Sequence, residues 1–287
     1  MARHPRPALY PEPVTIDLHT HSNRSDGTDT PTELVENAKR AGLDVVALTD
    51  HDTTVGWQEA QEAADKVGIR LVKGLEVSTA IEHRSIHLLG YDVDPRDVPL
   101  VDELRRVLDG RNGRVPKIVA AFARIGIDIT EEEILAKSGD AGSTGRPHVA
   151  DVLIDKGVVK DRSEAFDQYL QPGMPGYVGR YSVPTAQAIR LVKAAGGKAV
   201  LAHPWSRGSH KVLTPDRIAE LVDFGLDGIE VDHPDHSEEQ REGLRKIAAA
   251  YDLVVTGSSD YHGSGKTDDF RLGANTTSPD ELERLLG

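Results

Sequence analysis

The chain has 287 residues, of which 38% are hydrophobic, so it is long enough for one barrel-sized domain with a substantial core. Its formal net charge of -13 disfavours binding to long nucleic acid, because that binding needs clustered lysines and arginines; a small phosphorylated substrate stays possible. The absence of cysteine excludes disulfides, thiolate metal sites and a cysteine nucleophile.

Membrane and export signals are also lacking in the sequence. No apolar run approaches the roughly 18 residues that cross a bilayer. The N-terminus is basic and proline-rich, and it lacks the apolar stretch of a secretory signal. We therefore expect a cytoplasmic protein that does not bind membranes.

The first third of the chain alternates short apolar runs with amphipathic segments. Thr30, Pro31 and Glu33 have the spacing of an N-cap, an N1 proline and a capping box, so they predict a helix that ends at Gly42. A second helix is expected over 57–67. The predicted strands of this part are 14–18, 45–48, 71–72 and 86–89. Strands that alternate with helices predict parallel βα units.

Between 97 and 182 the pattern changes to consecutive helices. We expect one helix over 98–125, one that starts after Thr130, one opened by Pro147, and one over 163–169. No strand of comparable quality interrupts them. The prediction is a helical insertion domain over 97–182, acting as a lid or substrate domain, within a barrel formed by 14–96 and 183–287.

After residue 183 the alternation resumes. Helices are expected over 184–195, from Thr214 to Gly225, after Ser237 and after Ser278. The predicted strands of this part are 198–202, 228–231 and 253–256. About seven strands with helical crossovers predict an α/β fold, a closed or nearly closed β/α barrel.

Residues of the types that bind metals follow the predicted strands. Six of the 12 histidines lie at or near predicted strand ends, with Glu76 and Asp260 beside them: His19, His21, His51, His87, His203 and His262. A lone histidine there is more often a hydrogen-bonded structural residue, but the collective placement predicts a metal cluster. Imidazole and carboxylate without thiolate suit Mn, Zn or Fe, and the number of ligands implies two or three divalent ions.

Six motifs together resemble the polymerase and histidinol phosphatase (PHP) family. They span most of the chain and are Asp17-Leu18-His19-Thr20-His21-Ser22 with Ser25-Asp26-Gly27, Thr49-Asp50-His51-Asp52-Thr53, Gly74-Leu75-Glu76-Val77-Ser78, His87-Leu88-Leu89-Gly90-Tyr91, Ala202-His203-Pro204 and Gly257-Ser258-Ser259-Asp260-Tyr261-His262. The resemblance implies a distorted (β/α)7 barrel, in agreement with the strand count, here with the helical insertion.

The resemblance also implies a distribution of ligands among three metals. The first metal takes His19, His21, Glu76 and Asp260. The second shares Glu76 and takes His87 and His203, and the third lies near Asp26, His51 and His262. Many family members have histidine in place of Asp26, and carboxylate is a harder ligand, so the third site is expected to differ in metal or occupancy.

The insertion resembles the subgroup that acts on nucleoside 3′,5′-bisphosphates and on short RNA from the 5′ end. Arg146 and His148 at a proline-opened helix start are predicted to clamp a phosphate, although Arg146 has many acidic neighbours as alternative partners. For Arg111 and Arg114, substrate binding competes with an ordinary solvated helix face. His233 and His236 follow a strand and are predicted to contact substrate. The remaining histidines look incidental: His4, His83 and His210.

The combined prediction is a metal-dependent phosphoesterase that removes the 3′-phosphate of nucleoside 3′,5′-bisphosphates, such as pAp, and degrades short RNA as an exoribonuclease. Its predicted catalytic residues are Asp26, Glu76 and His262, with Asp26, His262 or metal-bound water as the general acid. One alternative is a histidinol phosphate phosphatase, against which the insertion with Arg146 and His148 argues. A non-catalytic metal-binding regulatory module is disfavoured by the complete ligand set. An amide-bond hydrolase would lack a phosphate clamp. The oligomeric state is not indicated.

Overall fold

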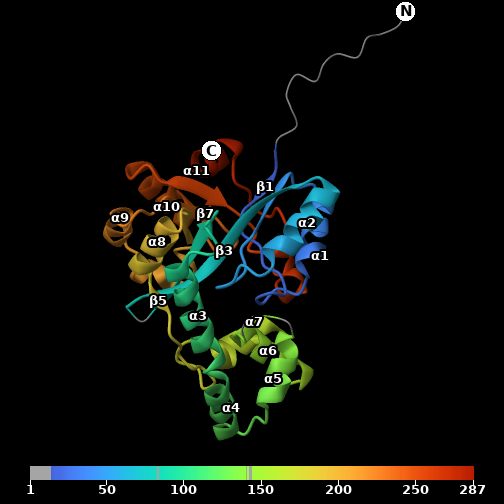
Figure 1. The fold of residues 1–287 in the computed structure, drawn as a ribbon. Helices are drawn as coiled ribbons and strands as arrows, with labels where there is room; N and C mark the ends of the chain where they lie inside the picture. The colour runs from blue at the N-terminus through green and yellow to red at the C-terminus, as the bar shows by residue number, and fades with distance from the viewer. Residues whose placement is uncertain (1–13, 83, 140, 142–143) are drawn as a thin grey trace, which may run out of the picture.

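The computed structural model describes residues 14–82, 84–139, 141 and 144–287. His4 and His83 lie outside these residues. A sheet with helices packed around it forms the larger part of the molecule, and a smaller group of helices extends from it (Figure 1). No helix of the described ranges is both long enough and apolar enough to cross a membrane.

Seven strands follow one another around the sheet in the order β1-β2-β3-β4-β6-β7-β8. Their bounds are β1 Ile16–Asp17, β2 Val45–Leu48, β3 Arg70–Ile81, β4 Arg84–Tyr91, β6 Lys198–Ala202, β7 Gly228–Asp232 and β8 Val254–Gly257. Strand β5 (Val183–Pro184) pairs with β3 outside this order. Beyond β1 and β8, a bridge between Thr20 and Tyr261 brings the two ends of the sheet together. The predicted distorted seven-stranded α/β barrel is confirmed.

The sheet is mixed, so the prediction of parallel units throughout is wrong. β4 is antiparallel to both β3 and β6, and the other pairs in the order are parallel. Only two residues separate β3 from β4, and such a short connection permits only an antiparallel hairpin. Glu82, in this turn, has the positive φ of 55° that tight hairpin turns require. β3 is also much longer than the predicted strand over 71–72.

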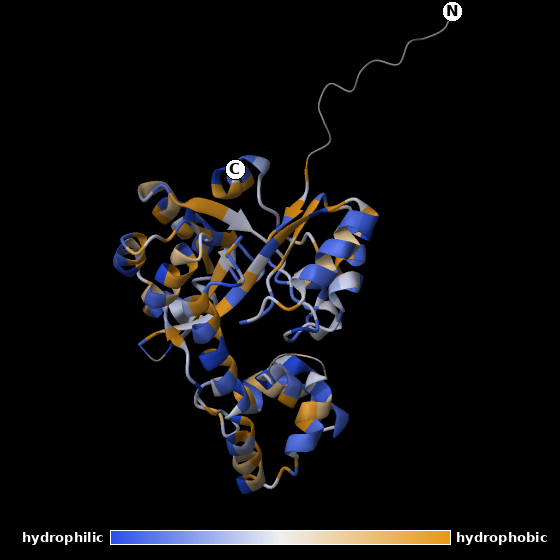
Figure 2. Cartoon of the chain, in the orientation of Figure 1, coloured by the Kyte–Doolittle hydropathy of each residue, from blue (hydrophilic) through white to orange (hydrophobic). Residues whose placement is uncertain are grey.

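Alternating residues of the strands pack into two different apolar clusters. In β1 and β2, Ile16, Val45 and Ala47 join the cluster inside the barrel, whereas Val46 and Leu48 join the cluster beneath the outer helices. The period of two therefore buries both faces of the sheet. Figure 2 shows apolar strands beside helices whose outer surfaces are hydrophilic.

The outer helices are amphipathic, and four of them begin at the predicted caps Thr30, Thr214, Ser237 and Ser278. The outer helices are α1 Pro31–Arg40, α2 Trp57–Val67, α8 Thr185–Ala194, α9 Pro215–Val222, α10 Glu238–Ala250 and α11 Pro279–Leu286. The capping boxes at Thr30 and Ser237 are both formed. These helices cover the sheet. The loops that follow the strands are left to carry the site.

The helical segment between β4 and β5 has six pieces: α3 Val98–Asn112, α4 Val115–Arg124, α5 Glu131–Ser138, α6 Arg146–Asp155, α7 Arg162–Ala165 and the π-helical turn η1 Phe166–Leu170. The single helix predicted over 98–125 is therefore two, because Pro116 cannot extend α3 and instead opens α4. The pieces from α4 to η1 share a core of their own, which includes Ile118, Phe122 and Leu153. The exact division at 97 and 182 stays a prediction.

Candidate metal centre

Most of the predicted ligands lie just beyond the strands, at one end of the sheet. His19 and His21 follow β1, His51 follows β2, His203 follows β6, and Asp260 and His262 follow β8. Glu76 and His87 differ, because they lie inside the β3–β4 hairpin and not at strand ends. Ser78 is opposite His87, and Glu76 is two residues before Ser78, so Glu76 and His87 share one face of the hairpin.

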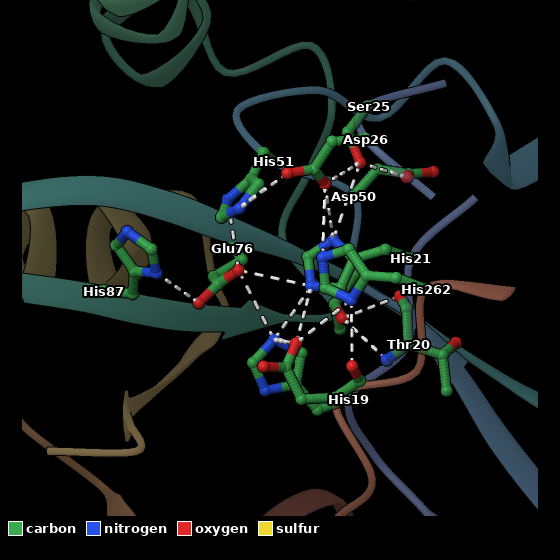
Figure 3. A network of polar contacts seen from close by, with 12 residues as sticks. His19, Thr20, His21, Ser25, Asp26, Asp50, His51, Glu76, His87 and His262 are labelled. Carbon is green, nitrogen blue, oxygen red and sulfur yellow. Dashed lines mark hydrogen bonds and ion pairs between the residues drawn. The ribbon is translucent and has the colours of Figure 1, made fainter. Parts of the chain in front are cut away.

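Glu76 lies at the centre of the cluster (Figure 3). Its Oε1 is 2.7 Å from His87 Nδ1 and 3.2 Å from His203 Nε2. Its Oε2 is 3.2 Å from His21 Nε2 and 3.1 Å from His51 Nδ1. The two oxygens of one carboxylate thus face two different sets of histidines, which is the arrangement that a bridging ligand needs.

The first group consists of His19, His21, Glu76 and Asp260. His19 Nε2 is 3.0 Å from His21 Nε2, 3.4 Å from Glu76 Oε2 and 3.6 Å from Asp260 Oδ1. Nitrogen and oxygen ligands at about 2.0–2.2 Å from a tetrahedral metal are about 3.3–3.6 Å from one another. The distances from His19 to Glu76 and Asp260 match the edges of such a coordination polyhedron, and the distance from His19 to His21 is a few tenths of an ångström shorter.

The second group, called the Asp26 group, consists of His21, Asp26, His51 and His262, whose ligand atoms lie within 4.8 Å of one another. Asp26 Oδ1 is 3.3 Å from His262 Nε2, and Asp26 Oδ2 is 3.8 Å from His51 Nε2. The ligand atoms of a third combination, His51, Glu76 and His87, also lie within 4.8 Å of one another. The structure thus brings all nine predicted ligands together, with His203 beside Glu76.

The donor atoms fit divalent cations. His51 Nδ1 is buried and makes no hydrogen bond with any described residue, although Glu76 Oε2 is 3.1 Å away. A buried nitrogen that faces a carboxylate without a hydrogen bond is suited to share a cation with it. The chemistry of the set, imidazole and carboxylate without thiolate, suits Mn, Zn or Fe.

Electrostatics keeps most of the set in the form that binds metals. Burial raises the pKa of Glu76, but His87, His51 and His19 outweigh it and hold that pKa well below its ordinary value. Burial, Lys266 and His21 lower the pKa of His262 to about 4, so its imidazole is neutral. Burial lowers the pKa values of His19 and His21, but the neighbouring carboxylates outweigh it and raise both, so a cation bound there would displace a proton.

Neighbouring groups orient the histidines. Glu230 Oε1 is 3.0 Å from His19 Nδ1, and Glu230 Oε2 accepts a hydrogen bond of 2.7 Å from the backbone of His203. Because an ionised carboxylate only accepts, His19 Nδ1 carries the proton and Nε2 faces the cluster. His262 Nδ1 likewise donates to the Asp260 carbonyl at 2.8 Å, which leaves its Nε2 for Asp26.

The backbone is strained at two of these residues. His203 has φ of 28° and Asp260 has φ of 53°, both in the left-handed region. Such conformations cost on the order of 1–3 kcal/mol each and are retained where the surrounding structure imposes them.

Of the predicted substrate residues of the insertion, Arg111, Arg114 and His148 are buried and Arg146 is half-buried. Arg111 and Arg114 are each 5% exposed, which excludes a solvated helix face for them. Arg111 donates to Asp52 Oδ2 at 2.8 Å and to Ser78 Oγ at 2.7 Å. Arg114 Nε is buried and makes no hydrogen bond within the described part of the chain.

Arg146 and Arg180 complete what we call the arginine cluster, with Arg111 and Arg114. Burial, then Arg111, Arg180 and Arg146, hold the pKa of Arg114 well below its ordinary value. Burial, then Arg111, lower the pKa of Arg180 to about 9. Arg111 and Arg114 are buried and Arg146 and Arg180 are half-buried, and their mutual effect on the pKa values favours an anion among them.

Arg146 and His148 lie at the start of α6, as predicted. Arg146 donates to the Leu170 carbonyl at 2.8 Å, and its guanidinium packs over the rings of Phe166 and Tyr177. Its contacts are therefore apolar rings and a carbonyl, and no ion pair with an acidic side chain is present among the described residues. His148 Nδ1 accepts from Gly145 N at 2.9 Å.

The two histidines that follow β7, His233 and His236, have different surroundings. His233 Nε2 is 3.3 Å from Asp260 Oδ2, so His233 adjoins the metal centre. His236 Nδ1 donates to the Val231 carbonyl, and its Nε2 accepts from Trp205 N. Both of its nitrogens are thus engaged by backbone, which makes substrate contact through them unavailable without rearrangement. His210 is exposed and lies outside the motifs that supply the predicted metal ligands.

Several residues near the site were not predicted. They are Glu230, Asp52, Lys266, Arg162 and Arg180. Lys266 Nζ contacts Asp260 Oδ2 and lies 4.3 Å from the Phe270 ring centroid. Asp52 stands in the motif Thr49-Asp50-His51-Asp52-Thr53, and Glu230 lies within β7, so their positions in or after a strand were a usable signal. The contacts of Arg162 and Arg180 depend on tertiary folding.

Known proteins resemble this chain along most of its length. The PHP domain matches residues 17–140. A 3′,5′-nucleoside bisphosphate phosphatase of Chromobacterium violaceum is 34% identical over 253 residues, which are 88% of this chain and 89% of the relative. A 5′-3′ exoribonuclease of Haemophilus influenzae is 35% identical over 246 residues, 86% and 89% of the two chains.

A solved structure agrees with these relatives. A protein from Bifidobacterium adolescentis assigned as a metal-dependent phosphoesterase superposes with a TM-score of 0.90 at 37% identity, over 96% of this chain and 97% of the other. The similar fold, the similar length and the buried cluster of histidines and carboxylates all support the same assignment. The chain belongs to the PHP family and is a metal-dependent phosphoesterase.

Proposed function

We propose that the chain removes the 3′-phosphate of nucleoside 3′,5′-bisphosphates, such as pAp, and that it also degrades short RNA from the 5′ end. Two relatives that share about a third of its residues carry these activities in their names. The observation that carries the proposal is the buried arginine cluster, in which Arg114 Nε has no hydrogen-bond partner among the described residues. A second phosphate would supply that partner.

The proposed ligands are His19, His21, Glu76 and Asp260 for one metal, His87 and His203 with Glu76 for a second, and Asp26, His51 and His262 for a third. Bound divalent metals polarise phosphate oxygens and lower the pKa of water, the chemistry that phosphoester hydrolysis requires. Glu76 would bridge two of the ions through its two oxygens. Manganese, zinc and iron all suit this donor set.

In the proposed reaction a water oxygen attacks the 3′-phosphorus and the bond from phosphorus to the 3′-oxygen breaks. The leaving 3′-oxygen takes a proton, and the products are a nucleoside 5′-monophosphate and inorganic phosphate. The proposed proton donor is a water held beside Asp26 and His262, whose side chains are 3.3 Å apart at Oδ1 and Nε2.

The other phosphate would bind the arginine cluster and His148. Arg111 already pairs with Asp52, the residue that follows His51, so the arginine cluster adjoins the metal centre. Burial lowers the pKa of Arg146 to about 10, which an incoming dianion would reverse. A monophosphate ester such as histidinol phosphate has no group for this region, so its hydrolysis is the less favoured alternative.

A substrate panel tests the proposal. Initial rates with Mn²⁺ would be compared for a nucleoside 3′,5′-bisphosphate, a nucleoside 3′-monophosphate, a 5′-phosphorylated short RNA and histidinol phosphate. We expect the bisphosphate to give the highest kcat/KM and to release only phosphate and the 5′-monophosphate. A higher kcat/KM for histidinol phosphate than for every nucleotide would overturn the substrate assignment and leave the metal chemistry intact.

A further inference from the structure

Arg162, the first residue of α7, reaches from the helical segment to the metal centre. Its Nε and Nη2 donate to the two carboxylate oxygens of Asp151 at 2.7 Å each. Its Nη1 donates to the backbone carbonyl of Asp26 at 3.1 Å. Asp151 belongs to α6, so one guanidinium connects α6 with a residue of the Asp26 group.

Arg162 also packs against the loop that follows His262. A Cβ added to Gly265 would lie 2.4 Å from Arg162 Nη1, so the guanidinium fills the space that a side chain there would take. The two loops are bonded to each other as well, because Thr28 N donates to the His262 carbonyl at 3.2 Å. Arg162 therefore lies where the loops of Asp26 and His262 meet.

The ion pair with Asp151 fixes the direction of this guanidinium. A fork of two parallel hydrogen bonds orients the planar group, and the third nitrogen is then aimed at a single acceptor. The side chain of Arg162 is only 15% exposed and that of Asp151 only 23%, so solvent competes weakly for these bonds. The ion pair therefore fixes the direction in which Nη1 points.

We propose that Arg162 is a positioning residue, which uses its ion pair with Asp151 to hold the loops of Asp26 and His262 in register and so completes the Asp26 group for metal binding. The metals attributed to His19, Glu76 and Asp260 do not depend on this contact. A purely structural role would change the stability of the fold. A positioning role changes the metal affinity of one group of ligands.

The test compares Arg162→Ala with Lys156→Ala. Lys156 ends α6 and pairs with Glu133 at 2.7 Å inside the same helical segment, so it controls for the lost charge and the lost ion pair. Each protein would be equilibrated with increasing free Mn²⁺, the metal content per chain measured by elemental analysis, and the fold checked by circular dichroism and thermal unfolding.

We expect Arg162→Ala to need about 10–100-fold more free Mn²⁺ to fill its weakest site, the usual effect of losing a group that orients a ligand. The tighter sites should fill as in the wild type, and excess Mn²⁺ should restore kcat on any phosphoester that the enzyme hydrolyses. Lys156→Ala should titrate like the wild type. Filling of every Arg162→Ala site at wild-type Mn²⁺ concentrations would overturn the proposal.

Gly265→Ala gives an independent test that removes no charge. Its new methyl group would push Arg162 Nη1 away from the Asp26 carbonyl, since the tip of the arginine is the part able to move. We expect the weakest site to lose affinity in Gly265→Ala but to lose no more in Arg162→Ala/Gly265→Ala than in Arg162→Ala. Equal losses from Gly265→Ala in both backgrounds would contradict the role of Arg162. If Arg162→Ala does not fold, Gly265→Ala and Asp151→Asn decide the question in the same titration.

Discussion

The metal centre and the arginine cluster are both buried and both charged, but they offer opposite chemistry. At the metal centre, carboxylate oxygens and imidazole nitrogens converge on Glu76, and the pKa values of Glu76 and Asp26 are held well below their ordinary values. In the arginine cluster, burial and the neighbouring arginines lower the pKa values of Arg114 and Arg180. The first gathers lone pairs and the second gathers N–H donors.

This difference indicates two ligands of opposite sign. Buried like charges are costly without a counter-ion, so the first region calls for cations and the second for an anion. Asp52 partly neutralises the second region through Arg111. A substrate with two phosphates would satisfy both regions, one phosphate through metals and the other through arginine.

The largest effect should come from removing the metals. Chelation followed by desalting should abolish turnover, because the lone pairs of the metal centre then have no cation to bring to the phosphate. Mn²⁺ or Zn²⁺ should restore the rate. Elemental analysis would check that the protein is depleted of metal. Full activity without bound metal would contradict the role of the first region as a metal centre.

Glu76→Gln tests the metal centre alone. The amide keeps the size of the side chain but removes the charge that five histidines face, so metal content and kcat should both fall, with kcat lower by at least about 100-fold. Glu62→Gln, on the exposed side of α2, is the matched control. Normal kcat with full metal content would refute the bridging role of Glu76.

Arg146→Ala tests the second region alone. A charge-assisted hydrogen bond contributes about 1.5–3 kcal/mol, so kcat/KM for a nucleoside 3′,5′-bisphosphate should fall about ten- to a hundredfold. Hydrolysis of an aryl phosphate should change little, because that ester reaches only the metals. Arg105→Ala, an exposed arginine of α3, is the control. Equal losses on both substrates would mean that Arg146, which packs on Phe166 and Tyr177, supports the fold instead.

The smallest effect has the opposite sign. Arg114→Met removes a buried guanidinium with an unpartnered Nε, so the ligand-free protein should gain about 1 kcal/mol of unfolding free energy, or about 2–4 °C in Tm. Arg105→Met should leave Tm nearly unchanged. A clear loss of Tm in Arg114→Met would show that the fold needs this charge, and the arginine cluster would then not be an empty anion site.

Local patterns in the sequence predicted the metal centre well. The period of two in His19 and His21 and the strand ends at His51 and His203 place these residues correctly, because parallel strands end at one mouth of a barrel. The capping box at Thr30 likewise marks the true start of α1. These signals work since each depends on a few neighbouring residues.

Contacts between residues far apart in the chain were not predicted from the sequence. The hairpin of β3 and β4 carries Glu76 and His87 inside its strands, and an apolar run alone does not distinguish a hairpin from a parallel unit. For Arg111 the sequence left substrate binding and a solvated helix face open, and it did not reveal Asp52, 59 residues earlier, which pairs with it in the interior. Arg162 required the approach of α7 to Asp26, which no spacing along the chain reveals.

One measurement tests the central claim most directly: the ratio of kcat/KM for a nucleoside 3′,5′-bisphosphate to that for the corresponding nucleoside 3′-monophosphate, in the wild type and in Arg114→Met. The two substrates differ only in the 5′-phosphate, the group assigned to the arginine cluster. We predict a wild-type ratio of at least about 10–100, from one or more charge-assisted interactions, that falls by about tenfold or more in Arg114→Met. A ratio near one in the wild type, or an unchanged high ratio in Arg114→Met, would contradict the assignment of a second phosphate to these arginines.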